Sequence, residues 1–186
     1  MELTPKIVAY VASEEGMVCE AYKDSVGVWT WALGVTNASG HQVYPRYLDN
    51  PQPFAKCLEV SAWLMREKYL PAVAKAFAGH DLNEAQIAAA LGFHWNTGKI
   101  MLAQWVRDWK DGKPNSAKAN ILNYRKPAVL LKRREREREL FFDGKWPALT
   151  VPVYPVSKAT HAPIWGRAEK VDLLPVLEQL QARGWA

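Results

Sequence analysis

The chain has 186 residues, of which 49% are hydrophobic and 23% are charged, a composition typical of a soluble globular protein rather than a disordered or fibrous one. Its formal net charge of +5 favours an anionic partner, and nucleic acid, acidic membranes and bacterial cell wall all qualify. With only Cys19 and Cys57, the sequence excludes a dense disulfide framework; it allows one bridge, but we expect two reduced thiols.

The first residues predict a short helix. It begins at Thr4 and Pro5, because Pro suits a first helical turn, and Gly16 can end it in a left-handed conformation. Glu15 is therefore expected in the last turn. The same segment has no long apolar run, so it predicts neither a signal peptide nor a membrane anchor.

Residues 21–43 change to β-branched and aromatic residues interrupted by glycines, which predicts a small sheet of two or three strands. Helical spacing resumes at Phe54 and runs towards Leu70, where we expect Pro71 to kink or interrupt the helix. A long helix in this position would join two lobes.

The next helix has a well-specified start at Asn83, with Gln86 in the position of a capping-box partner. Its sequence AQIAAALGFHW is almost wholly apolar, which predicts burial on most sides, and residues 96–98 end it. His94 within it is expected to be a packed core residue. Further helices are predicted at about residues 100–110, 116–124 and 128–142.

The segment from Val151 opens with VPVYPVSKATHAP, whose prolines predict an extended chain, and a last helix is expected at about residues 170–182. Together these elements predict an α+β fold that is mostly helical. We expect residues 1–150 to form one domain. Residues 151–186 would then be a tail that packs on that domain or has another role.

Two acidic residues near the first helix could act as a catalytic pair. Glycoside hydrolysis needs one carboxylic acid to protonate the leaving oxygen and a second carboxylate to direct water or stabilise the sugar cation. Glu15 at a helix end and Asp24 in a turn could reach one site from two elements, with the Thr30 hydroxyl holding a water against Asp24. Taken singly, such residues are usually solvated surface groups.

The spacing of these residues is more specific. Glu15 is followed after eight residues by Asp24, and Asp24 after five by Thr30, with Gly and aromatic residues around them. This pattern resembles the signature of phage-type lysozymes, also called endolysins, a family of glycoside hydrolases. The resemblance implies that Glu15 is the acid and that Asp24 and Thr30 are its partners, and the gap to Asp24 selects Glu15 over Glu14.

Two later segments support the resemblance. Residues 88–98 look like the family's buried helix, which ends beside the substrate, and the Arg-rich segment that includes Arg133 resembles its closing helix. The resemblance implies that Trp95 and Asn96 contact the sugar chain and that Arg133 pairs with Glu15. Many relatives carry a histidine in the strand after the catalytic Asp, and this chain does not.

The resemblance implies a lysozyme-like fold with two lobes, a small β-sheet lobe and a helical lobe around a substrate cleft. It also implies cleavage of the β-1,4 bond between N-acetylmuramic acid and N-acetylglucosamine in peptidoglycan, with the inversion associated with the family. We expect a monomer made in the host cytoplasm, without stable membrane insertion, that reaches the wall after membrane permeabilisation by a holin.

Other functions receive less support. A non-catalytic wall-binding module of the same fold remains the alternative, although such a module should have lost one of Glu15, Asp24 and Thr30. Nucleic-acid binding is disfavoured because the run KRRERERE at 132–139 alternates Arg with Glu, and apart from Arg133 most of this run should be a solvated face. Four scattered His and two Cys give no metal-ligand spacing, so no metal or cofactor is expected.

Overall fold

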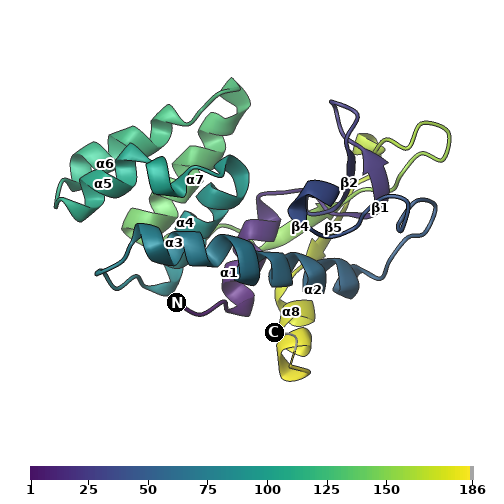
Figure 1. The fold of residues 1–186 in the computed structure, drawn as a ribbon, viewed down its shortest axis with the longest axis horizontal. Helices are drawn as coiled ribbons and strands as arrows, with labels where there is room; N and C mark the ends of the chain where they lie inside the picture. Colours follow the sequence, from purple (N-terminus) through teal and green to yellow (C-terminus); the bar gives the residue numbers. More distant parts are fainter. Residues whose placement is uncertain (185–186) are drawn as a thin grey trace. The chain divides into compact units, whose positions relative to one another are not determined.

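The computed structural model describes residues 1–184, in which the chain forms two compact units. The helical unit combines residues 1–11 with residues 65–148, and the sheet unit combines residues 12–64 with the residues from 149 onwards. Each unit is thus assembled from two separate stretches of chain, which the colours of Figure 1 trace along the sequence. The predicted α+β class with a majority of helix is confirmed.

The helical unit receives most of α1 (Pro5–Ser13) and the helices that follow residue 65. These are α3 (Leu70–Ala76), α4 (Glu84–Thr97), α5 (Gln104–Lys110), α6 (Pro114–Asn120) and α7 (Leu131–Asp143), with 3-10 turns at 100–102, 121–123 and 128–130. The predicted helices of this region are therefore confirmed.

Helix α4 is the core of the helical unit. Its start is the predicted capping box, in which the Asn83 side chain accepts from the Gln86 amide at 3.0 Å and the Gln86 side chain accepts from the Asn83 amide at 3.0 Å. Gly98 ends it in the left-handed conformation, with φ of 65°. Nine of the fourteen residues between these caps are buried, as the apolar pattern predicts, and His94 packs against Tyr69.

An aromatic cluster fills the space between α4 and its neighbours. The rings of Phe77, Phe93, Trp105 and Phe141 lie in contact, with neighbouring centroids between 5.0 and 5.9 Å apart. Each of these side chains is buried, so the cluster contributes much of the apolar area removed from water in this unit.

The long helical stretch after residue 54 is interrupted just before Pro71, near the position that the sequence predicts. Helix α2 (Phe54–Leu64) continues through a π-helical turn at Met65–Tyr69 into α3, which begins at Leu70. Pro71 lacks an amide hydrogen, and its ring clashes with the carbonyl of residue 67 in a regular helix, so the widened turn accommodates it. The boundary between the two units falls at this turn.

The sheet unit contains the remaining strands and helices. These are β1 (Val18–Lys23), β2 (Trp29–Ala32), β3 (Val35–Thr36), α2, β4 (Thr150–Val153), β5 (Glu169–Asp172) and α8 (Leu174–Ala182). Strands β1, β2 and β3 form one antiparallel sheet in chain order, and β4 and β5 form a separate antiparallel pair.

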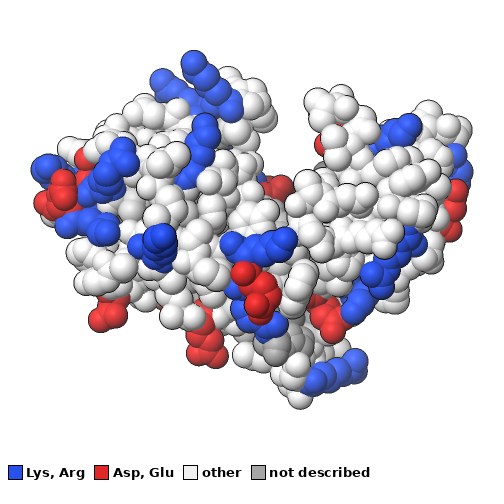
Figure 2. Space-filling view, viewed as in Figure 1, with Lys and Arg blue, Asp and Glu red and all other residues white. Residues whose placement is uncertain are grey.

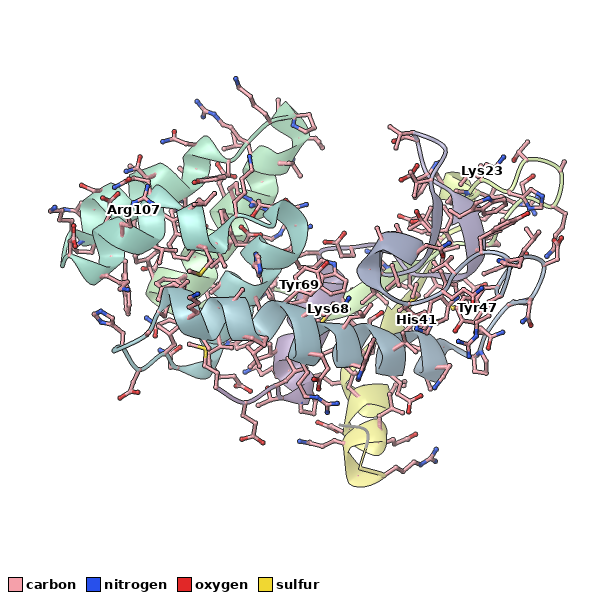
Figure 3. All side chains as sticks on the ribbon, in the orientation of Figure 1. Lys23, His41, Tyr47, Lys68, Tyr69 and Arg107 are labelled. Carbon is pink, nitrogen blue, oxygen red and sulfur yellow. The ribbon has the colours of Figure 1, made fainter. Side chains whose placement is uncertain are left out.

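The core of the sheet unit lies beneath β2. Trp31 is fully buried, stacks on Tyr47 at a centroid distance of 4.1 Å, and donates its indole N–H to the Cys19 carbonyl at 3.1 Å. His41 joins the stack and lies 2.8 Å from the Tyr47 hydroxyl, and Figure 3 labels both residues. Cys19 and Cys57 are free thiols, as expected.

The tail differs from its prediction in one respect. Its opening prolines lie in extended chain as expected, but residues 169–172 form β5 instead of the start of a helix. Helix α8 begins only at Leu174, which places Pro175 in its first turn, where a missing amide hydrogen costs nothing. Among residues 1–184, none of the helices is long and apolar enough to cross a membrane.

Candidate active site

Asp24 begins the loop between β1 and β2. Its Oδ1 accepts from the amide of Val26 at 3.0 Å and from that of Val28 at 2.8 Å. Its own amide donates to the Val28 carbonyl at 3.0 Å, and Gly27 adopts a φ of 83° that favours glycine. The loop thus closes on itself and holds the half-buried carboxylate in one orientation.

Thr30 lies on β2 two residues beyond Val28. It is buried, with 4% of its surface exposed, and its hydroxyl donates to the Val28 carbonyl at 3.1 Å. Asp24 and Thr30 therefore share the Val28 carbonyl as an acceptor. Because the hydroxyl hydrogen is directed at Val28, the oxygen of Thr30 keeps its lone pairs for accepting another donor.

Glu15 lies in a different position from the one expected. Helix α1 ends at Ser13, and Glu15 lies in the turn that follows. The Glu15 amide donates to the Ala12 carbonyl at 3.1 Å. The expected left-handed Gly16 is also wrong, since Gly16 is absent from the positions with positive φ. Gly16 instead packs closely, because a Cβ there would lie 2.8 Å from the ring of Tyr154 and would force the ring or the backbone to shift.

The pKa of Tyr22 responds to the charges of both carboxylates. This β1 residue pairs with Thr30 across the sheet, and its pKa is raised to about 12, first by burial and then by the negative charges of Asp24 and Glu15. Both carboxylates therefore act electrostatically on one phenol. Tyr22 lies two residues before Asp24 in the sequence motif, but nothing in the spacing alone indicates that Glu15 lies near it.

The predicted substrate-binding residues lie in the helical unit. Trp95 is half-buried against Tyr69, with ring centroids 4.6 Å apart, and Asn96 is exposed near the end of α4. The Asn96 side-chain oxygen accepts from Arg134 at 2.8 Å. Sequence reasoning missed Arg134, which orients Asn96.

Arg133 is buried, donates to the Glu137 carboxylate at 3.1 Å and donates to the Gly92 carbonyl at 3.1 Å. Arg134 donates to the same Glu137 oxygen at 2.8 Å. The expectation that this part of the run is a solvated face is therefore wrong for Arg134 and Glu137. Their three-residue spacing on α7 is the signal that could have linked them. The pairing of Arg133 with Glu15 stays a prediction.

Within the part of the chain that the structure describes, no group of three His, Cys, Asp or Glu side chains could hold a metal ion. The half-buried carboxylates of Glu15 and Asp24, with the Thr30 oxygen, are groups that can donate a proton, stabilise a cation and orient water.

Comparison with known proteins identifies a family for this chain. The family model described as phage lysozyme matches residues 12–137, a stretch that includes Glu15, Asp24, Thr30, Trp95, Asn96 and Arg133. Among curated proteins, none matches the sequence significantly.

Solved structures of similar fold include phage endolysins and a muramidase domain. An endolysin from the Escherichia coli O157:H7 phage FAHEc1 is 19% identical, with a TM-score of 0.68 over 79% of this chain and 97% of that one. A mutant of P22 lysozyme is 24% identical, with a TM-score of 0.63 over 76% of this chain and 98% of that one.

The muramidase domain of SpmX from Asticaccaulis excentricus is 19% identical, with a TM-score of 0.57 over 76% of this chain and 97% of that domain. At these identities the structural likeness shows the fold, which is the predicted lysozyme-like one. The family model spans more than half of the chain, so the chain belongs to the phage lysozyme family and is a muramidase-type glycoside hydrolase of bacterial peptidoglycan.

Proposed function

We propose that this chain hydrolyses the β-1,4 bond between N-acetylmuramic acid and N-acetylglucosamine, with Glu15 as the general acid. The observation that supports this assignment is the placement of two half-buried carboxylates in one unit, Glu15 in the turn after α1 and Asp24 in the loop before β2, both of which add negative charge near the half-buried Tyr22. A glycosidase needs two carboxyl groups at one site, and a sequence gap alone does not supply that proximity.

In this mechanism Glu15 protonates the glycosidic oxygen as the bond to the leaving sugar breaks. Asp24 stays ionised and either directs a water onto the sugar carbon or stabilises the positive charge that develops there. Thr30, whose oxygen can still accept a hydrogen bond, accepts one hydrogen of that water and so aligns it with Asp24.

We further propose an inverting reaction, which requires a water between Asp24 and the sugar and a carboxyl separation of roughly 6.5–9.5 Å. Trp95 and Asn96 would contact the glycan from the helical unit, and Arg133 would pair with Glu15. Host lysis after membrane permeabilisation by a holin is part of the same proposal.

The charge distribution supports an anionic wall as the target. Figure 2 shows Lys and Arg side chains scattered over this face of both units, with acidic side chains between them. A net charge of +5 spread in this way attracts a polyanion over a distance of about one Debye length, roughly 8–10 Å, without a basic stripe for one strand of nucleic acid.

The test is the release of reducing ends from purified peptidoglycan by wild type, Glu15→Gln and Glu14→Gln. Glu15→Gln removes the proton donor with almost no change in shape, so we expect a loss of about 100-fold or more. Glu14→Gln is the matched control and should retain activity. New reducing ends distinguish a muramidase from an amidase or a lytic transglycosylase.

Three results would contradict the proposal. Equal activity of Glu15→Gln and wild type would remove Glu15 from the acid role, while wall binding without new reducing ends in any variant would indicate the non-catalytic module. A product whose anomeric configuration is retained, measured by NMR in the first minutes of the reaction, would exclude the inverting mechanism.

A further inference from the structure

The C-terminal segment contacts the chain directly after Glu15. Strand β4 forms a parallel bridge with Met17, in which the Met17 amide donates to the Pro152 carbonyl at 2.9 Å and the Tyr154 amide donates to the Met17 carbonyl at 2.9 Å. Both backbone polar groups of Met17 are therefore bonded to the tail. Met17 is also fully buried, so its position is fixed by packing as well.

Tyr154 holds the residue between Glu15 and Met17. A Cβ added to Gly16 would lie 2.8 Å from Cε2 of the Tyr154 ring, closer than real Cβ atoms approach such neighbours, and 3.3 Å from Cδ2, which is a tight contact. The ring is supported from another direction by Trp165, at a centroid distance of 4.8 Å. Tyr154 thus lies directly against the backbone that carries Glu15.

The tail also contacts the residue before Asp24. The Lys23 amide donates to the His161 carbonyl at 2.7 Å, and the His161 ring lies beside Trp29 at 5.5 Å. His161 has a φ of 52°, which is a left-handed conformation. The surrounding turn maintains this conformation, because the His161 amide donates to the Ser157 carbonyl at 2.8 Å.

The tail is itself anchored in the sheet unit. Strand β4 pairs with β5 from Thr150 to Val153, and α8 packs on α2 with Leu177 fully buried. Figure 1 shows β4 and β5 beside the β1 and β2 region of this unit. These contacts make the tail a fixed support and not a loose extension.

We propose that residues 149–184 form a brace that positions the two catalytic carboxylates, with Tyr154 setting the Glu15 segment and the His161 carbonyl setting the Asp24 loop. This inference rests on the proposed roles of Glu15 and Asp24. The brace lies outside the stretch matched by the family model, which ends at residue 137. Tyr154 is a positioning residue, since it acts through Gly16 and not on the glycan.

The main test compares Tyr154→Ala with Tyr154→Phe on soluble peptidoglycan fragments. Loss of the ring lets the Glu15 segment move, and a displacement of about 1 Å can reduce a rate on the order of 100-fold. We therefore expect Tyr154→Ala to lower kcat by about 10- to 100-fold and to leave KM nearly unchanged. The acidic and basic limbs of the plot of kcat against pH should also shift. Tyr154→Phe keeps the ring and should stay within about twofold of wild type.

A second test uses the contact itself. Gly16→Ala adds a methyl group that overlaps the Tyr154 ring. The double variant Gly16→Ala with Tyr154→Ala lacks the ring and has room for the methyl group. The two changes should be strongly non-additive in kcat, because each alters the same contact. Gly166→Ala is the matched control in the same segment, since its added Cβ meets no atom within 4 Å.

A third experiment tests the brace independently of the acid role of Glu15. The Glu15 carboxyl group is titrated by NMR in wild type and in Tyr154→Ala. A changed titration midpoint with Glu15→Gln fully active would support the brace and overturn the acid. An unchanged midpoint, kcat and pH profile in folded Tyr154→Ala, together with an inactive Glu15→Gln, would overturn the brace and leave the acid in place. Folding of each variant is checked by its thermal unfolding.

Discussion

The Val28 carbonyl is the point at which the two partners of Glu15 meet. It accepts from the Asp24 amide and from the Thr30 hydroxyl, so the hydroxyl both stabilises the loop and offers its oxygen to a water. These two contributions can be separated, because one depends on the hydroxyl hydrogen and the other on the oxygen lone pairs.

Replacing Thr30 with Val keeps the shape of this buried side chain and removes the hydroxyl. We expect the free energy of unfolding to fall by about 0.5–1.5 kcal/mol, the usual contribution of one hydrogen bond, because Val28 keeps its bond from Asp24. The kcat should fall much further, by about 100-fold. Thr30→Ser restores the hydroxyl and should recover most activity; urea unfolding and reducing-end release measure the two effects, and a fully active Thr30→Val would contradict the role in water alignment.

Tyr22 provides a pH-dependent measure of its own burial and, after that, of the two nearby carboxylates. Its pKa is about 12 in the folded chain against an ordinary value of 10, so the folded state keeps the phenol proton while the unfolded state loses it. The contribution of Tyr22 to stability is therefore complete below pH 10 and is lost as the pH rises from 10 to 12. At 1.36 kcal/mol per pKa unit, the loss is about 2–3 kcal/mol.

Tyr22→Phe should lack this component. The difference in free energy of unfolding between wild type and Tyr22→Phe is expected to be constant from pH 7 to pH 9.5 and to decrease by about 2–3 kcal/mol by pH 12. Chemical unfolding at a series of pH values measures it, and a difference that does not change with pH would show that neither burial nor the carboxylates act on the phenol as described.

The sequence alone proposes Glu15, Asp24 and Thr30 as site residues, and their roles stay predictions. Glu15, Asp24 and Thr30 follow from spacing in one short stretch, and the family match and fold support the motif that contains them. Arg134 and Tyr154 could not be predicted in the same way. Their contacts join residues that are 38 and 138 positions apart, and no local pattern encodes such distances.

Local signals also explain which elements were predicted correctly. The caps of α4 at Asn83 and Gly98 depend on residues within one turn of the helix end, so the sequence identifies both. Strand β5 was assigned to a helix because Val171 fits the helical spacing of the leucines that follow it. Its pairing with Val151 depends on a partner strand about twenty residues away.

Helix α7 depends on a buried ionic cluster. The Glu137 side chain is 0% exposed and accepts from Arg133 and Arg134, so this carboxylate compensates two guanidinium groups inside the helical unit. Glu137→Ala should lower the free energy of unfolding by about 3–5 kcal/mol, because it leaves those charges buried without their shared carboxylate.

The matched control is Glu135→Ala on the same helix, which lies outside this cluster and should change stability by less than about 0.5 kcal/mol. Urea unfolding measures both variants. If Glu137→Ala were as stable as wild type, α7 would be held by its apolar contacts alone, and the orientation of Asn96 by Arg134 would not need the carboxylate.

At the scale of the whole molecule, the sheet unit is completed by a segment outside the family match. Val151, Leu173 and Leu177 of this segment are fully buried, and they pack in a unit whose other residues come from positions 12–64. The helical unit is built from residues 1–11 and 65–148 and includes none of the tail. Removing the tail should therefore affect the two units differently.

A chain ending at Ala148 tests this difference by hydrogen exchange. Loss of Pro152 and Tyr154 removes both backbone partners of Met17, and loss of α8 exposes the face of α2 that it covers. Amides of β1, β2 and α2 should therefore lose protection. Amides of α4 and α7 should keep theirs, because these helices belong to the unit built from residues 1–11 and 65–148, which the shortened chain retains. A chain ending at Ala182, which retains all of α8, serves as the control, and equal protection of β1 in all three chains would show that the sheet unit folds without its C-terminal segment.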